Sequence, residues 1–309
     1  MTQPMTVRDD VLDFYRTQTP FTDPGSHADR YDELSEDLAE LCATLQGLMI
    51  HMFWIGEQTY GVTRGELKAK GRDIVSEINL RTAEERLGRI LELDPSSLSA
   101  PRGATARVVG NCRDYSLLLV SILRHRGIPA RVRSGVARYF FPDSGFLEDH
   151  LICEFWNAED ERWQQTDAQI DDVQKAALKL EMDMIDLPRD EFLCAAEAYR
   201  ELKEGRKQPK EIGFPPDFCG YPYVRYKLFS DLACITGQET LPFEGWGLGS
   251  QSEPHPGDDA LMEDVAGLLL VLNDEPQRLR VALDLMQTHP RLACPQGYKP
   301  KSFQEEWLG

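Results

Sequence analysis

The feature that most constrains the fold is an apolar, helix-like stretch followed directly by three strand-like runs. Residues 111–126 carry an unbroken apolar centre, and Gly127 and Pro129 stand where a helix is expected to end. Strand-like runs then cover residues 130–141, 150–156 and 162–166, with a polar stretch typical of a hairpin between the last two. This order predicts an α+β fold in which a small antiparallel sheet packs on one buried helix.

Helical patterns flank this core on both sides. Leucines from Leu34 to Leu48 recur at steps of three and four residues, which predicts one long amphipathic helix from about residue 29 to residue 56. Two closing helices are expected at 258–272 and 275–288. We therefore expect one domain over residues 1–309, with these parts: a catalytic core at about 105–170, a helical N-terminal part at 7–100 and a helical C-terminal extension at 171–309.

Charge and cysteine content exclude several classes of function. The 309 residues hold 34 Lys+Arg against 52 Asp+Glu, a net charge of −18, which disfavours nucleic acid and anionic membranes as partners. The 7 cysteines show neither a paired spacing nor a Cys/His cluster. Residues 1–10 are polar, and no apolar run approaches the length of a membrane span. We expect a cytoplasmic protein with reduced thiols, no metal and no cofactor.

Cys112 is the first candidate for chemistry, because it lies in the first turn of the most apolar helix. The unpaired N–H groups and the positive dipole at a helix N-terminus both favour a thiolate. Gly110 would allow a sharp turn and a close approach of substrate, and the Cys112 N–H could donate to an oxyanion. A lone cysteine is more often a small buried hydrophobe, as we expect for Cys153 in mid-strand.

His150 and Asp167 begin and follow the two strands of the expected hairpin. If Trp156 pairs with Glu161, residue numbers on opposite strands sum to 156 + 161 = 317, and 150 + 167 also equals 317. The two side chains would then face each other directly, as a carboxylate that orients an imidazole must do. Each residue alone could be purely structural, so the hypothesis rests on the order Cys, His, Asp and on the register.

The same stretch resembles a known superfamily. Gly110-Asn111-Cys112-Arg113-Asp114, then Gly127-Ile128-Pro129, His150 and Thr166-Asp167 are similar to the core of transglutaminase-like proteins over about residues 105–170. A weaker likeness to an uncharacterised bacterial branch continues through residues 231–247. The resemblance implies a papain-like fold with Cys112 as nucleophile, His150 as general base and acid, and Asp167 as orienting carboxylate.

The resemblance also implies a side-chain donor to the oxyanion, from the segment that precedes the cysteine helix. The candidates are Trp54, Gln58, Tyr60 and Asn111, of which Gln58 or Trp54 is preferred.

The function implied is cysteine-dependent acyl transfer at an amide or thioester through a Cys112 acyl-thioester. The favoured version is an amidase or peptidase acting on a small-molecule or peptide acyl substrate. The alternatives are a transamidase or amide synthase that also takes an amine acceptor, and a non-catalytic binding module. Arg131, Arg133 and Arg138 on the first strand suggest either attraction of a carboxylate or phosphopantetheine group, or a solvated strand face. The sequence leaves the oligomeric state open.

Overall fold

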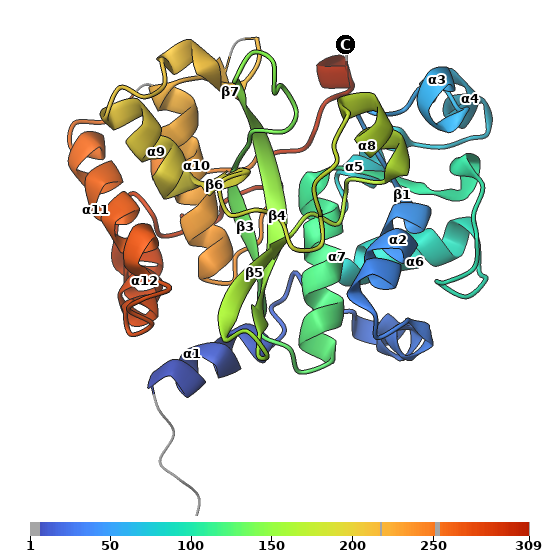
Figure 1. The fold of residues 1–309 in the computed structure, drawn as a ribbon, viewed down its shortest axis with the longest axis horizontal. Helices are drawn as coiled ribbons and strands as arrows, with labels where there is room; N and C mark the ends of the chain where they lie inside the picture. The colour runs from blue at the N-terminus through green and yellow to red at the C-terminus, as the bar shows by residue number, and fades with distance from the viewer. Residues whose placement is uncertain (1–6, 217, 251–253, 309) are drawn as a thin grey trace, which may run out of the picture.

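A sheet of six strands divides the molecule into two helical layers (Figure 1). The computed structural model describes residues 7–216, 218–250 and 254–308. The sheet runs in the order β6-β3-β4-β7-β8, and β5 also pairs with β4. The bounds are β3 Ala130–Ala137, β4 Leu147–Asn157, β5 Arg162–Thr166, β6 Phe192–Cys194, β7 Ile212–Phe214 and β8 Phe218–Cys219. All pairings are antiparallel except that of β4 with β7, so the predicted α+β class is confirmed.

Helix α7 (Cys112–His125) packs on one face of this sheet, with α2 (Leu38–Leu48) and α6 (Ala83–Leu93) outside it (Figure 1). Every residue from Cys112 to Arg124 is buried, because the helix is covered on all sides. Its first turn is fixed by a capping box in which the Asn111 side chain accepts from Arg113 N–H and Asp114 accepts from Asn111 N–H. The strongest helix signal in the sequence therefore marks the central helix of the fold.

The opposite face of the sheet carries the C-terminal helices (Figure 1). They are α9 (Ala195–Lys203), α10 (Tyr221–Ile235), α11 (Asp258–Val271) and α12 (Arg278–Thr288). Leu228 and Phe229 of α10 join Val136 and Ile152 of the sheet in the larger of the two main cores. The extension at 171–309, expected to be helical, also contributes the short strands β6, β7 and β8. Strands of two or three residues are too short to show a period of two.

The N-terminal part is more broken than the leucine spacing predicts. The helix expected at 29–56 is only α2, because Asp37 caps its start by accepting from Glu40 N–H and the chain becomes extended after Leu48. Residues Met49–His51 form strand β1, which pairs in parallel with β2 (Val108–Gly110) just before α7. The remaining helices are α1 (Val7–Arg16), α3 (Glu57–Tyr60), α4 (Arg64–Ala69), α5 (Ile74–Ile78) and α8 (Asp172–Leu178).

The hairpin of β4 and β5 forms, but its predicted register is wrong by two residues. Trp156 pairs with Trp163, so paired numbers sum to 156 + 163 = 319. Asn157 belongs to the strand and caps the turn by accepting from Glu159 N–H and Asp160 N–H, while Glu161 takes a left-handed conformation (φ 51°). A shift of two residues preserves side-chain parity, which is why the consequence for the site is small.

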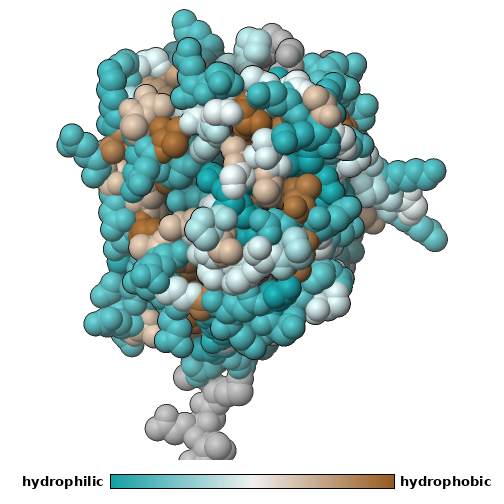
Figure 2. Space-filling model, turned by 90° about the vertical axis from the view of Figure 1, so that its right-hand side faces the viewer, coloured by the Kyte–Doolittle hydropathy of each residue, from teal (hydrophilic) through white to brown (hydrophobic). Residues whose placement is uncertain are grey.

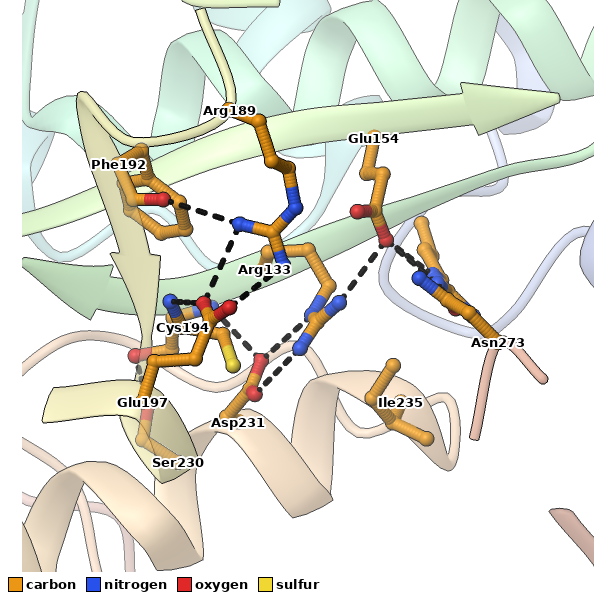
Figure 3. A network of polar contacts seen from close by, with 12 residues as sticks. Arg133, Glu154, Arg189, Phe192, Cys194, Glu197, Ser230, Asp231, Ile235 and Asn273 are labelled. Carbon is orange, nitrogen blue, oxygen red and sulfur yellow. Dashed lines mark hydrogen bonds and ion pairs between the residues drawn. The ribbon is translucent and has the colours of Figure 1, made fainter. Parts of the chain in front are cut away.

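The arginines of β3 are neither a solvated face nor an anion site. Arg133 pairs with Glu154 on β4 and makes two bonds to Asp231 on α10, at 3.0 and 2.9 Å (Figure 3). Arg131 also binds Glu154, and its guanidinium stacks on the Trp163 ring. Although burial raises the pKa of Glu154, the two guanidiniums hold it down at about 2. This network joins the sheet to α10, so these charges stabilise the fold and are not free to bind an anion. Arg138, at the end of the strand, donates to the carbonyl of residue 190.

The outer face over the N-terminal elements is largely hydrophilic, with hydrophobic side chains in small, separate patches (Figure 2). None of the helices in the described residues is both long and apolar enough to cross a bilayer.

Candidate active site

Cys112 begins α7 at the point where β2 ends. Strand β2 delivers the chain to the helix start, and the buried ion pair of Arg86 with Asp114 (2.8 Å) lies beneath the first turn. A Cβ on Gly110 would come within 2.9 Å of Asp114 Oδ2. Gly110 is therefore needed to make room for this pair, rather than for a left-handed turn. Cys112 itself is 7% exposed, and its exposed part faces a cavity.

His150 and Asp167 form a buried ion pair beside Cys112. His150 Nε2 lies 2.7 Å from Asp167 Oδ2, and both side chains are 1% exposed. Burial alone would lower the pKa of His150, but the Asp167 carboxylate and the Cys112 side chain together raise it to about 10. Because Nε2 is engaged by Asp167, Nδ1 is the ring nitrogen left to exchange a proton with the sulfur.

Asp167 lies one residue beyond the end of β5 and is held there by further donors. Tyr139 O–H donates to Oδ2 at 2.6 Å, and Gln169 N–H donates to Oδ1 at 2.9 Å. Burial raises the pKa of Asp167, yet His150 and these hydrogen bonds lower it below its usual value. Phe140 closes over the imidazole at 5.0 Å between ring centroids. The carboxylate therefore stays ionised and fixes the ring orientation.

A cavity of about 1160 Å³ opens over Cys112 and His150. Its wall is rich in aromatic side chains. Phenylalanines come from five separate segments of the chain: Phe53, Phe140, Phe141, Phe214, Phe218, Phe243 and Phe303. Phe53, Phe141 and Phe214 are exposed, and the Phe53 and Phe214 rings lie 5.8 Å apart. Apolar side chains are therefore presented to a substrate around the sulfur.

The C-terminal segment completes the wall, which the sequence did not indicate. Residues 301–304 line the cavity, and Phe303 is buried. Its N–H donates to Asn79 Oδ1 at 2.7 Å, and its carbonyl accepts from Asn79 Nδ2 at 3.2 Å. Residues 301–304 therefore complete a wall to which residues 51–54 also contribute.

The four residues considered as oxyanion donors lie in different places. Trp54 lines the cavity and is half-buried, whereas Gln58 on α3 is exposed and lies outside the cavity wall. Tyr60 donates to Asp171 at 2.7 Å and is not in the wall. Asn111 lines the cavity, but its Oδ1 is used in capping α7. The structure therefore does not bring Gln58 to the site.

The titratable residues of the cavity that the sequence did not indicate include His51 and Glu148. His51 on β1 is buried, and burial together with His150 lowers its pKa to about 3. Burial, then the Asp149 charge, raises the pKa of Glu148 to about 8. A single histidine in a three-residue strand gives no periodic signal, and neither residue belongs to the motif around Cys112. Within the described residues, no cluster of three or more His, Cys, Asp or Glu could hold a metal ion.

Comparison with known proteins finds a match to a family model and a distant structural similarity. The chain contains a domain of the transglutaminase-like superfamily, whose family model matches residues 80–168. A crystal structure described as a proposed cysteine protease from Cytophaga hutchinsonii is similar at 14% identity and a TM-score of 0.30. That match covers 62% of this chain and 48% of the other. A search of curated proteins finds no match.

Proposed function

We propose that this protein is a cysteine-dependent amidase or peptidase that forms an acyl-thioester on Cys112. The observation that carries the proposal is the arrangement of three groups. A cysteine at a helix N-terminus and an imidazole whose pKa is raised to about 10 both line one cavity, and a buried carboxylate lies 2.7 Å from that ring. A protonated imidazole beside the sulfur stabilises negative charge there and can supply a proton to the leaving group. Such a pair is poised for nucleophilic attack on an acyl carbon.

The reaction proceeds in two steps. The Cys112 thiolate adds to the carbonyl carbon, and the tetrahedral intermediate collapses as the C–N bond breaks and His150 gives its proton to the leaving amine. His150, now neutral, takes a proton from water as the water oxygen adds to the thioester carbon. The second tetrahedral intermediate then collapses as the C–S bond breaks, which releases the acid and returns the electron pair to the Cys112 sulfur. Asp167 keeps the imidazole oriented through both steps. The aromatic cavity favours an acyl group with an apolar side chain.

The first test is selective labelling. Iodoacetamide at neutral pH should alkylate Cys112 at least about tenfold faster than Cys294, which is exposed and serves as an internal control. Uniform slow labelling of all seven thiols would instead favour the non-catalytic binding module.

The second test separates hydrolase from transamidase. The protein is incubated with p-nitrophenyl phenylacetate, and intact-mass spectrometry should show one acyl group on wild type and none on Cys112→Ala. The adduct should decay to free acid in water at a rate that added butylamine leaves unchanged. Quantitative conversion to the butylamide would establish the transamidase alternative, and the absence of any adduct would refute the proposed function.

A further inference from the structure

His51 is placed beside the nucleophile by the short parallel pair β1 and β2. Its Cα partner across the pair is Gly110, two residues before Cys112, and Met52 N–H donates to the Gly110 carbonyl at 2.8 Å. Because paired strands lie about 4.8 Å apart, this pairing places His51 next to the start of α7. The ring lines the same cavity as Cys112 and His150.

The ring of His51 is held in one tautomer. Phe53 N–H donates to Nδ1 at 3.4 Å, so Nδ1 is the acceptor and the proton of the neutral ring is on Nε2. Burial, followed by the neighbouring His150, lowers the pKa of His51 to about 3, which keeps it neutral at working pH. Within the described part of the chain, no group accepts a hydrogen bond from Nε2. An uncharged N–H donor therefore faces the cavity.

We propose that His51 Nε2–H is the side-chain donor of the oxyanion hole, acting with the Cys112 backbone N–H. This inference rests on the proposed function. When the C–S bond forms, the carbonyl π electrons move to oxygen, and the two N–H groups bind the resulting O⁻ without transferring a proton. When the C–N bond breaks, the electrons return to the carbonyl, and His150 supplies the proton for the leaving amine.

The other candidates are less suited to this position. Asn111 Nδ2 is enclosed, since it is buried without a hydrogen-bond partner, and its Oδ1 is held by the helix cap. Trp54 is only half-buried. A neutral imidazole also adds no second positive charge beside the His150 imidazolium. The hydrogen bond that it donates becomes stronger as negative charge develops on the substrate oxygen.

The test compares acylation with alkylation in three variants. His51→Leu removes the donor, and His51→Gln keeps an N–H at similar reach. Gln58→Leu is the matched control, because it removes an exposed amide that lies outside the cavity wall. Single-turnover acylation by p-nitrophenyl acetate should fall about 10²- to 10³-fold in His51→Leu and recover to within about tenfold of wild type in His51→Gln. Gln58→Leu should acylate at the wild-type rate.

Alkylation by iodoacetamide provides the control for structure. This displacement at a saturated carbon creates no oxyanion, so the rate at Cys112 should be unchanged in His51→Leu. Equal loss of acylation and alkylation would assign His51 a packing role and overturn the proposal, as would normal acylation in His51→Leu or no recovery in His51→Gln. If wild type is not acylated while Cys112 is alkylated normally, the proposed function itself fails and the oxyanion role fails with it.

Discussion

Two buried charge clusters lie on the central sheet, and they differ in whether they reach the cavity. The Arg133 guanidinium is enclosed by Glu154 and Asp231, and all three side chains are at most 3% exposed (Figure 3). The His150–Asp167 pair is equally buried, but one edge of it opens through Cys112 to a cavity of about 1160 Å³. Burial and perturbed pKa values are common to both clusters, so these properties alone do not mark a site. What distinguishes the second cluster is a reactive atom that meets the cavity.

We therefore expect substitutions in the two clusters to have opposite effects on turnover and stability. In the cluster that faces the cavity, a change should affect turnover more than stability. In the enclosed cluster, a change should affect stability more than turnover.

The largest effect is expected for Cys112→Ala. Loss of the sulfur removes the nucleophile, so turnover of a p-nitroanilide substrate should fall by on the order of 10⁶. Because the side chain is small and borders a cavity, the free energy of unfolding, measured in urea, should stay within about 1 kcal/mol of wild type. Residual turnover above about one per cent would assign the chemistry to a group other than Cys112.

Asp167→Asn should lower turnover by on the order of 10⁴ while the fold is retained. The carboxylate raises the pKa of His150, so the imidazolium that protonates the leaving amine persists up to about pH 10 and is lost above it. Without the carboxylate, the alkaline limb of kcat/KM for a p-nitroanilide should move to lower pH. Glu148→Gln is the control, because Glu148 also titrates, at about pH 8, and should leave the His150 limb in place. Turnover within tenfold of wild type would remove Asp167 from its role.

The sequence predicts those parts of the site that a continuous stretch specifies. The helix expected at 111–126 is α7, and the strand expected at 162–166 is β5. The apolar centre and the stop signals define the helix locally, and the family motif lies on these same elements. His150 and Asp167 meet even though the register was wrong, because a shift of two residues preserves the face.

The remainder of the site depends on contacts between distant segments. His51 reaches Cys112 only through the pairing of β1 with β2, two strands of three residues each. Phe303 reaches the cavity because Asn79 binds its backbone. Arg133 looked like part of a positive strand because its partner Asp231 lies far along the chain, on α10. Composition and periodicity carry no signal for such pairings.

Asp231→Ala, in the enclosed cluster, should lower stability and leave turnover nearly unchanged. It leaves the Arg133 guanidinium and Ser134 N–H without the partner that now accepts from both, at 2.9–3.0 Å. Stability should fall by about 3–5 kcal/mol, while kcat of the folded fraction stays within about threefold of wild type. Urea unfolding and active-site titration measure the two quantities. The double variant Arg133→Met with Asp231→Leu should regain much of the stability, since no buried charge is then unpaired. A large loss of kcat in folded protein would show that this network also controls the site.

Tyr139→Phe is the smallest change and tests where the catalytic cluster stops. The phenol donates to Asp167 at 2.6 Å, so its loss should raise the pKa of Asp167 and loosen the imidazole, lowering kcat about three- to tenfold. The cost in stability should be about 1.5–3 kcal/mol, as for a hydrogen bond to a charged group. Tyr15→Phe is the matched control, because Tyr15 is equally buried and donates at 3.1 Å to the Ile235 carbonyl, remote from the cavity. It should cost about 1 kcal/mol and leave kcat unchanged. If the two variants behave alike in kcat, Tyr139 belongs with the structural groups and the catalytic cluster ends at Asp167.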